Sequence, residues 1–371
     1  MECAAGDNSC LAKSGRDTLH AAFEFVLSKL PLDMLPAPLA RALSSRPTLE
    51  FALAFFVLSI AFYLFTLTLR SAPLPKLRPD EYESFRLVRK EELTPTVRRY
   101  VFGLRDPKER PNLPIGHHVS LKYVDEDGKD VVRSYTPVSG PESPGVVSLV
   151  VKVYNPDAST SYPGGAMSFF LDNMIPGDSI LMRGPKGTMT YEGCGRFVVH
   201  KTSKKAEERR EAKHIVLLCG GTGITPMLRV ARGELDKLDK QGTKGKNKAT
   251  TKKVGDEGEG ANVTLLFANS TDGDVPLKPE FDRLQEEHPD RFKVVYIASK
   301  VEGGERGEDR VKAWKDNGKN EIGRLSVDML KRHVPTTNPT QFLICGPPGF
   351  VKALLENLKA MGYDESSWFI F

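Results

Sequence analysis

The spacing of apolar residues divides the larger, C-terminal part of the chain into two regions. Between about Glu83 and Phe197, short stretches of alternating apolar and polar residues are separated by turn-forming residues. These stretches read VRRYVFGL, HHVSLKYV, VVRSYTPV, VVSLVVKVY and SILMRGP. Short, evenly spaced strands of this kind predict an antiparallel β-barrel or sandwich.

From about Ala212 to Phe371 the pattern changes to apolar strands that alternate with amphipathic helices. The strand patterns are IVLLC, NVTLLFA, FKVVYIA and QFLIC, and the helix patterns are TPMLRVARGELDKL, PEFDRLQEEH, SVDMLKRH and PPGFVKALLENL. This alternation predicts a parallel α/β sheet. We therefore expect a β-barrel domain over residues 83–200 and an α/β domain over residues 212–371.

One uncharged apolar run precedes both regions. Residues 51–69, FALAFFVLSIAFYLFTLTL, are about long enough to cross the hydrocarbon core of a bilayer as a helix. The run follows an N-terminal segment, 1–50, and precedes a Pro-rich linker, 70–82, so a cleaved signal peptide fits poorly. We expect a transmembrane helix, with a buried core helix as the alternative.

Charges near the run predict an orientation. Basic residues are more numerous after it than before it, which by the positive-inside rule leaves the C-terminal domains in the cytosol. We therefore expect the chain to be anchored in the endoplasmic reticulum membrane or the mitochondrial outer membrane, with its catalytic domains facing the cytosol.

Composition excludes some classes of function. The formal net charge of +5 arises from basic residues scattered among nearly as many acids, which argues against a nucleic-acid partner. The five cysteines form no CxxC or Cys/His pattern, so we expect no protein-bound metal. Residues 238–262, rich in Lys, Gly and Thr, predict a disordered surface insertion, and the charged segment 200–214 predicts a solvated loop.

Two matching phrases in the α/β region point to a nucleotide site. HIVLLCGGTGITPM begins at His214 and QFLICGPPGFVKAL begins at Gln341, and each reads as a strand, a Gly/Pro turn and a helix. Parallel sheets bind nucleotides at the carboxyl ends of such strands. The GGTG turn lacks the third glycine of the GxGxxG fingerprint, which disfavours an FAD-binding Rossmann half.

The barrel region holds candidates for a second phosphate-bearing cofactor. In RSYT, Arg133 offers a bidentate phosphate contact, Tyr135 a planar surface and Thr136 a hydroxyl, as a flavin dinucleotide requires. In GGAMS, Gly164 and Gly165 precede a predicted helix, and a helix N-terminus attracts anions. A cross-strand pair on a solvated face and an ordinary helix start are the alternatives. Two cofactors in two domains indicate electron or hydride transfer.

The ordered set of motifs resembles a known family. RSYT, VVKVY at 150–154, GGAMS, RGPKG at 183–187, GGTGITPM and CGPPG occur in the order found in NADH-cytochrome b5 reductases, within the ferredoxin reductase-like flavoprotein superfamily. The resemblance covers roughly Glu83 to Phe371. It implies an antiparallel β-barrel domain for FAD and an α/β domain for NADH. It also implies hydride transfer from NADH to FAD, followed by transfer of single electrons to cytochrome b5.

The resemblance implies a role for each motif residue around FAD. Thr136 matches the residue near flavin N5, and His118 matches a histidine that supports its hydrogen bonding. Ala166 stands where the family usually has Lys, so FAD could be held less tightly. The FAD-binding residues implied in this way are Arg133, Ser134, Tyr135, Thr136, Val151, Lys152, Tyr154, Gly164, Gly165, Met167 and Ser168.

The resemblance likewise implies residues around the nicotinamide nucleotide. Cys345 matches a residue beside the nicotinamide, where we expect it to position the ring and not to act as a nucleophile. Ser299, followed by Lys300, occupies a position where an acidic residue favours NADH, so NADH is expected and NADPH is the alternative. The implied nucleotide-binding residues are Gly221, Thr222, Gly223, Thr225, Pro226, Ser299, Cys345, Gly346 and Pro347.

Thr136, His118 and Cys345 are thus the candidate catalytic residues. The chain shows neither a haem domain nor the cysteine spacing of plant-type ferredoxins, so its electrons must pass to a separate partner. Two alternatives remain open at this point. One is an NADPH-preferring reductase that supplies electrons to another acceptor, and the other is a membrane-tethered binding protein without flavin.

Overall fold

The computed structural model describes most residues of the two predicted domains. The residues it describes are 59–60, 76–140, 143–156, 164–201, 206–242, 260–301, 307–315, 320–336 and 339–371. The chain divides into two units, Met1–Pro73 and Leu74–Phe371. The second unit contains both the barrel and the α/β domain.

The expected transmembrane helix at 51–69 is corrected by the structure. Among the described residues, no helix is both long enough and apolar enough to cross a membrane. Within that segment only Ser59 and Ile60 are described, as helical, and the remainder lies outside the described residues, as do 1–50. The expected location of the catalytic domains remains a prediction.

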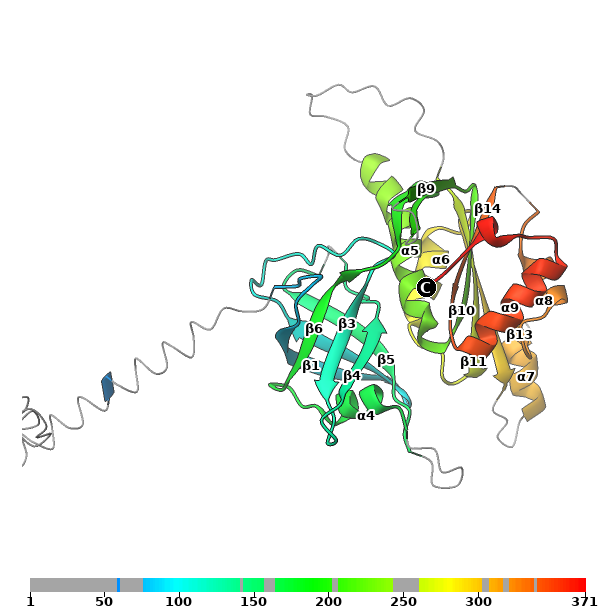
Figure 1. Ribbon diagram of the computed structural model, residues 1–371. Helices are drawn as coiled ribbons and strands as arrows, with labels where there is room; N and C mark the ends of the chain where they lie inside the picture. The colour runs from blue at the N-terminus through cyan, green and yellow to red at the C-terminus, as the bar shows by residue number, and fades with distance from the viewer. Residues whose placement is uncertain are drawn as a thin grey trace, which may run out of the picture. The chain divides into compact units, whose positions relative to one another are not determined.

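The first domain is a six-stranded antiparallel sheet in the order β4-β3-β6-β1-β2-β5, which curls around its own core (Figure 1). Its strands are β1 (Glu83–Thr94), β2 (Val97–Gly103), β3 (His118–Val124), β4 (Asp130–Tyr135), β5 (Val146–Lys152) and β6 (Ser179–Lys186). Helix α4 (Ala166–Asn173) lies between β5 and β6 in sequence. Alternation places Phe85, Leu121 and Leu149 in the core with no exposed surface.

A three-stranded antiparallel sheet follows, formed by β7 (Met189–Gly193), β8 (Arg196–Lys201) and β9 (Ala206–Glu211). Strand β9 corrects the prediction of a loop over 200–214, because Ala206–Glu211 pairs with Arg196–Lys201. Its sequence AEERRE has no apolar residue beyond Ala206, so no hydrophobic alternation marks it as a strand. Backbone pairing with β8 and a hydrogen bond from Arg210 Nη1 to the Trp368 carbonyl (2.9 Å) hold it in place.

The second domain is the predicted parallel sheet, in the order β13-β12-β11-β10-β14-β15. Its strands are β10 (His214–Gly220), β11 (Asn262–Thr271), β12 (Phe292–Lys300), β13 (Glu321–Ile322), β14 (Thr340–Cys345) and β15 (Trp368–Ile370). Its helices are α5 (Ile224–Gly242), α6 (Lys278–Glu287), α7 (Gly307–Lys315), α8 (Val327–His333) and α9 (Pro348–Ala360).

Helices cover both faces of this sheet (Figure 1). Leu228 of α5 and Phe281 of α6 belong to the core on one face, and Leu330 of α8 and Leu354 of α9 belong to the core on the other. Every residue of β10 is buried, as expected for a central parallel strand covered on both sides. Helix α5 includes the first residues of the expected insertion 238–262, of which 243–259 lie outside the described residues.

The strand order creates the crevice in which such sheets bind ligands. Strand β11 pairs on one side of β10 and β14 pairs on the other, so the connections leave β10 and β14 in opposite directions. The carboxyl ends of β10 and β14 lie side by side, with Cys219 paired to Cys345. This is the topological switch point, where loops part and leave room for a nucleotide.

Candidate functional site

A cleft of about 960 Å³ lies where the two domains meet, and residues of both domains line it. The barrel contributes the ends of β4 and β5, and the α/β domain contributes the loops after β10 and β14. Many of the predicted site residues are therefore brought together. Those lining the cleft are Ser134, Tyr135, Thr136, Lys152, Tyr154, Gly221, Thr222, Gly223, Thr225, Pro226, Ser299, Cys345, Gly346 and Pro347.

Glycines allow the two nucleotide loops to meet. A Cβ on Gly223 would lie 2.3 Å from the Cys345 carbonyl oxygen, so the turn after β10 packs backbone against backbone on the turn after β14. Gly221 has φ +56°, and a Cβ there would meet no atom within 4 Å. Gly223 is thus required by packing, whereas Gly221 is favoured by its left-handed backbone and leaves open space above the turn.

The thiol of Cys345 and the phenol of Tyr135 stay protonated near neutral pH. Burial raises the pKa of the Cys345 thiol to about 11, which agrees with a positioning role and not with a nucleophile. Burial also raises the pKa of Tyr135, with Tyr154 adding to the effect and Arg133 opposing it. On the barrel side of the cleft, Tyr135 therefore offers a neutral aromatic ring next to Thr136.

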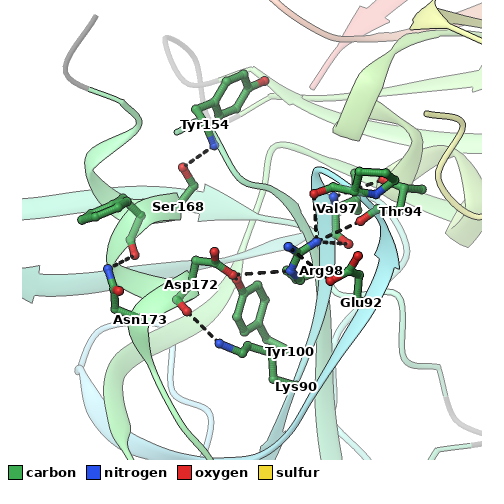
Figure 2. A network of polar contacts seen from close by, with 12 residues as sticks. Lys90, Glu92, Thr94, Val97, Arg98, Tyr100, Tyr154, Ser168, Asp172 and Asn173 are labelled. Carbon is green, nitrogen blue, oxygen red and sulfur yellow. Dashed lines mark hydrogen bonds and ion pairs between the residues drawn. The ribbon is translucent and has the colours of Figure 1, made fainter. Parts of the chain in front are cut away.

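Helix α4 is tied to the barrel wall by its last turn (Figure 2). The carboxylate of Asp172 accepts a hydrogen bond from the Tyr100 hydroxyl (3.5 Å) and pairs with Arg98 Nε (3.5 Å). Lys90 Nζ donates to the Asp172 carbonyl at 2.7 Å. These contacts fix the direction in which the opposite end of the helix points.

That opposite end has no side-chain cap. Gly165 is the N-cap residue and Gly164, at φ +85°, needs the glycine backbone. The Ser168 hydroxyl donates to the Gly165 carbonyl (3.0 Å) and accepts from the Tyr154 amide (3.2 Å), so it joins the helix to the end of β5. Within the described part of the chain no side chain caps the first amides of α4, so they are available to an anion, as at many helix N-termini.

These residues fit the diphosphate and ring of FAD. Arg133 is exposed, and among the described residues its guanidinium donates to the Val132 carbonyl (2.7 Å), which leaves further donors for phosphate. Tyr154 keeps 44% of its surface exposed and lines the cleft with Tyr135. Arg133 and the start of α4 would hold the diphosphate, and the two tyrosines would flank the ring.

Several predicted residues lie outside the cleft. Val151 and Met167 are 3% and 2% exposed, with side chains in the barrel core, so only their backbones are available to a ligand. His118 begins β3 opposite Lys186, and burial followed by the Lys186 charge lowers its pKa. The predicted residues that do not line the cleft are His118, Arg133, Val151, Gly164, Gly165, Met167 and Ser168.

His117, beside His118, has an unusual environment. Its Nε2 lies 2.9 Å from the Thr190 hydroxyl, and its Nδ1 is buried with no hydrogen-bond partner in the described part of the chain. Burial, with smaller effects from nearby cationic and histidine groups, lowers its pKa, so the ring is neutral near pH 7. The family resemblance gave a role to His118 and none to His117, and no pattern in the sequence predicted this environment.

Lys152 links the two domains. Its Nζ donates to Asp274 Oδ2 at 2.6 Å, and the same carboxylate accepts from the hydroxyls of Thr94 (2.5 Å) and Thr96 (2.7 Å). Burial alone would raise the pKa of Asp274, but the hydrogen bonds from Lys152 and the threonines outweigh it and lower the pKa. Asp274 therefore stays ionised and joins the α/β domain to the barrel at Lys152, Thr94 and Thr96.

The structure adds lining residues that sequence reasoning missed. Asn269 and Ser270 end β11, a position that the carboxyl-end rule for parallel strands would have identified. Gly323, Arg324 and Leu325 follow β13, whose two residues are too few to show a strand pattern. The other missed lining residues are Val150, Gly220, Ala268, Pro348, Gly349, Phe350, Ala353 and Leu354.

Comparison with known proteins agrees with this architecture. Residues 84–191 match the family model described as oxidoreductase FAD-binding domain, and residues 217–356 match that described as oxidoreductase NAD-binding domain. NADH-cytochrome b5 reductase 3 of Mus musculus is 36% identical over 327 residues, which cover 86% of this chain and 98% of that protein. NADH-cytochrome b5 reductase 2 of Danio rerio is 36% identical over 289 residues, covering 77% and 82%.

A solved structure shows the same arrangement of domains. The cytochrome b5 reductase domain of Ulva prolifera nitrate reductase aligns with a TM-score of 0.65 and 29% identity, over 80% of this chain and 99% of that one. Two family models and relatives matched over nearly their full length confirm the resemblance seen in the motifs. The chain therefore belongs to the NADH-cytochrome b5 reductase family and is an oxidoreductase with FAD and NADH as its cofactors.

Proposed function

We propose that this chain takes hydride from NADH onto FAD and passes the electrons one at a time to cytochrome b5. The supporting observation is the cleft, in which Tyr135 and Thr136 of the barrel face the nucleotide loops at Gly223 and Cys345. When bound, FAD accepts two electrons together and releases them singly, which connects a two-electron donor with a one-electron acceptor.

The chain's own residues would provide alignment. Gly223 and the backbone of the turn after β10 allow close approach of the nucleotide, and the neutral thiol of Cys345 shapes the nicotinamide end. Thr136 would offer its hydroxyl at the reactive edge of the flavin ring. Lys152 and Asp274 keep the two walls of the cleft in register, and such alignment accounts for much of the rate in reactions of this type.

Cytochrome b5 is proposed as the acceptor because relatives of high coverage carry that name. A chain with a formal net charge of +5 can dock an acidic partner through basic side chains, and such docking weakens as salt screens the charges. We therefore expect the reduction of cytochrome b5 to slow with rising ionic strength, while flavin reduction by NADH changes little.

The test uses the full chain loaded with FAD under anaerobic conditions. We expect NADH to bleach the flavin absorption band and added oxidised cytochrome b5 to acquire its reduced haem spectrum. Thr136→Val should slow the bleaching by about tenfold or more, because it removes one hydrogen bond to the reacting ring. Thr136→Ser, which keeps the hydroxyl, is the matched control and should retain most of the rate.

The outcomes separate the two half-reactions. Absence of bleaching in the wild-type chain would overturn the proposal as a whole. Bleaching without reduction of cytochrome b5 would overturn only the acceptor. Equal rates for Thr136→Val and Thr136→Ser would remove the hydroxyl from the mechanism.

A further inference from the structure

One end of the cleft is formed by polar residues at the carboxyl ends of three adjacent strands. Asn269 of β11 pairs with Ala298 of β12, which places Ser270 and Ser299 at the same level of the sheet. Ala298 also pairs with Ile322 of β13, and the Gly323 amide donates to the Ala298 carbonyl at 2.9 Å. Arg324 therefore follows β13 beside Ser299, and all three polar side chains line the cleft.

The described residues at this end of the cleft carry positive charge. Among the described residues that line the cleft none is acidic, and the cationic ones are Lys152 and Arg324. Lys152 is paired with Asp274 at 2.6 Å, whereas Arg324 is exposed and forms no ion pair with any described residue. Lys300, also exposed, follows Ser299 directly and adds a second positive charge nearby.

Glu321, the acidic residue of β13, already has cationic and histidine partners. Glu321 Oε1 accepts from Arg332 Nη2 at 2.9 Å and lies 2.8 Å from His333 Nε2. Neither Arg332 nor His333 lines the cleft. Glu321 is therefore held by side chains of α8 and does not offset Arg324.

The position of these residues matches one part of a dinucleotide. Its diphosphate belongs at the switch point, over the turn after β10. Adjacent strands are about 4.8 Å apart, so β12 lies about 10 Å from β10 along the sheet. This displacement leads from the diphosphate to the adenosine ribose. Ser270, Ser299 and Arg324 thus lie where the 2′ position of that ribose is expected.

We propose that Arg324, with the hydroxyls of Ser299 and Ser270, binds a phosphate on the 2′ position of the adenosine ribose, so that the chain accepts NADPH as well as NADH. A site restricted to NADH places a carboxylate here, which accepts hydrogen bonds from the ribose hydroxyls and repels phosphate. A guanidinium does the reverse, because it donates two parallel hydrogen bonds to a phosphate. NADPH would give up the same hydride as NADH and leave as NADP⁺, with its 2′-phosphate unchanged.

The inference rests on the proposed function, but its test is a binding measurement that needs no turnover. Adenosine 2′,5′-bisphosphate and 5′-AMP differ only by the 2′-phosphate, and calorimetry with the FAD-loaded full chain compares them directly. We expect the bisphosphate to bind at least as tightly as 5′-AMP. Arg324→Ser should weaken the bisphosphate by about tenfold or more and change 5′-AMP by less than about twofold.

Two further variants sharpen the measurement. Lys331→Ser removes an exposed cation of α8 that does not line the cleft, and it should leave both affinities unchanged. Ser299→Asp introduces a carboxylate at an exposed position and should weaken the bisphosphate much more than 5′-AMP. The same Ser299→Asp chain should show a higher ratio of the KM for NADPH to the KM for NADH than the wild-type chain.

Either of two results would overturn the inference. One is a bisphosphate affinity about tenfold below that of 5′-AMP in the wild-type chain, and the other is an equal loss for both ligands in Arg324→Ser. Bleaching of the flavin by NADH in the same preparation keeps this failure distinct from failure of the proposed function. If NADH bleaches the flavin and the bisphosphate does not bind, only the 2′-phosphate site is disproved.

Discussion

At the scale of single residues, Gly223 shows how packing and nucleotide binding depend on one missing methyl group. Its Cβ position lies 2.3 Å from a backbone oxygen of Cys345, which cannot move without displacing the turn after β14. We expect Gly223→Ala to lower the free energy of unfolding by about 1–3 kcal/mol, the usual cost of overpacking, and to weaken NADH binding. Denaturant unfolding and NADH titration measure the two effects.

Gly349 is the matched control at this scale. It lies in the first turn of α9, where an added Cβ would meet no atom within 4 Å. Gly349→Ala should leave the free energy of unfolding unchanged or raise it by up to about 1 kcal/mol, because alanine is the better helix former. If both variants lost the same free energy of unfolding, the role given to the close contact at Gly223 would be contradicted.

At the scale of elements, α4 shows how contacts at one end of a helix determine what the other end can bind. Asp172→Ala removes the pairing with Arg98 and Tyr100 seen in Figure 2 and keeps the bond from Lys90 to the main chain. We expect the dissociation constant for FAD to rise by about tenfold, since the loss of one or two polar contacts loosens the amides at Gly165. The rise in flavin fluorescence as FAD leaves the protein measures this dissociation constant.

Asn173→Ala is the control for the helix. Asn173 is exposed, and its side chain donates to the Phe169 carbonyl within α4, so it does not tie the helix to the barrel. FAD affinity in this variant should match the wild type. If Asp172→Ala also matches the wild type, the anchoring of α4 has no part in holding FAD.

At the scale of the whole molecule, one hydrophobic cluster contains residues of both domains. Val97 and Val150 of the barrel pack in the same cluster as Ile224, Leu228 and Val275 of the α/β domain. Because apolar packing across the junction couples the stability of its two sides, we expect both domains to unfold in a single calorimetric transition. Asp274→Ala should lower the transition temperature by several degrees without splitting it, and should slow flavin bleaching by NADH.

The control for this coupling is an ion pair within one element. Glu287 pairs with Arg283 on the surface of α6 at 2.7 Å, and exposed pairs of this spacing contribute about 0.3–0.5 kcal/mol. Glu287→Ala should therefore leave both the transition temperature and the bleaching rate near their wild-type values. Two resolved transitions in the wild-type chain would show that the domains unfold independently.

Local patterns in the sequence were enough to predict both cofactor-binding domains and the family. Gly223 could be predicted because it follows a buried apolar strand, and parallel sheets bind ligands at the carboxyl ends of such strands. Tyr135 was predicted from the RSYT motif and the family resemblance. The same patterns led to two wrong predictions, the transmembrane helix at 51–69 and the loop over 200–214. A count of apolar residues does not show what a segment pairs with or packs against.

The sequence alone thus determined the two domain classes, the strands and helices around the two nucleotide turns and the likeness to the reductases, since these depend on neighbours along the chain. Tertiary structure alone decided that Lys152 bonds to Asp274, and that Arg324 lines the cleft beside Ser299. Lys152 and Asp274 are 122 residues apart, and β13, which places Arg324, is only two residues long. Contacts between such distant segments follow from sheet order and domain packing, which no local pattern encodes.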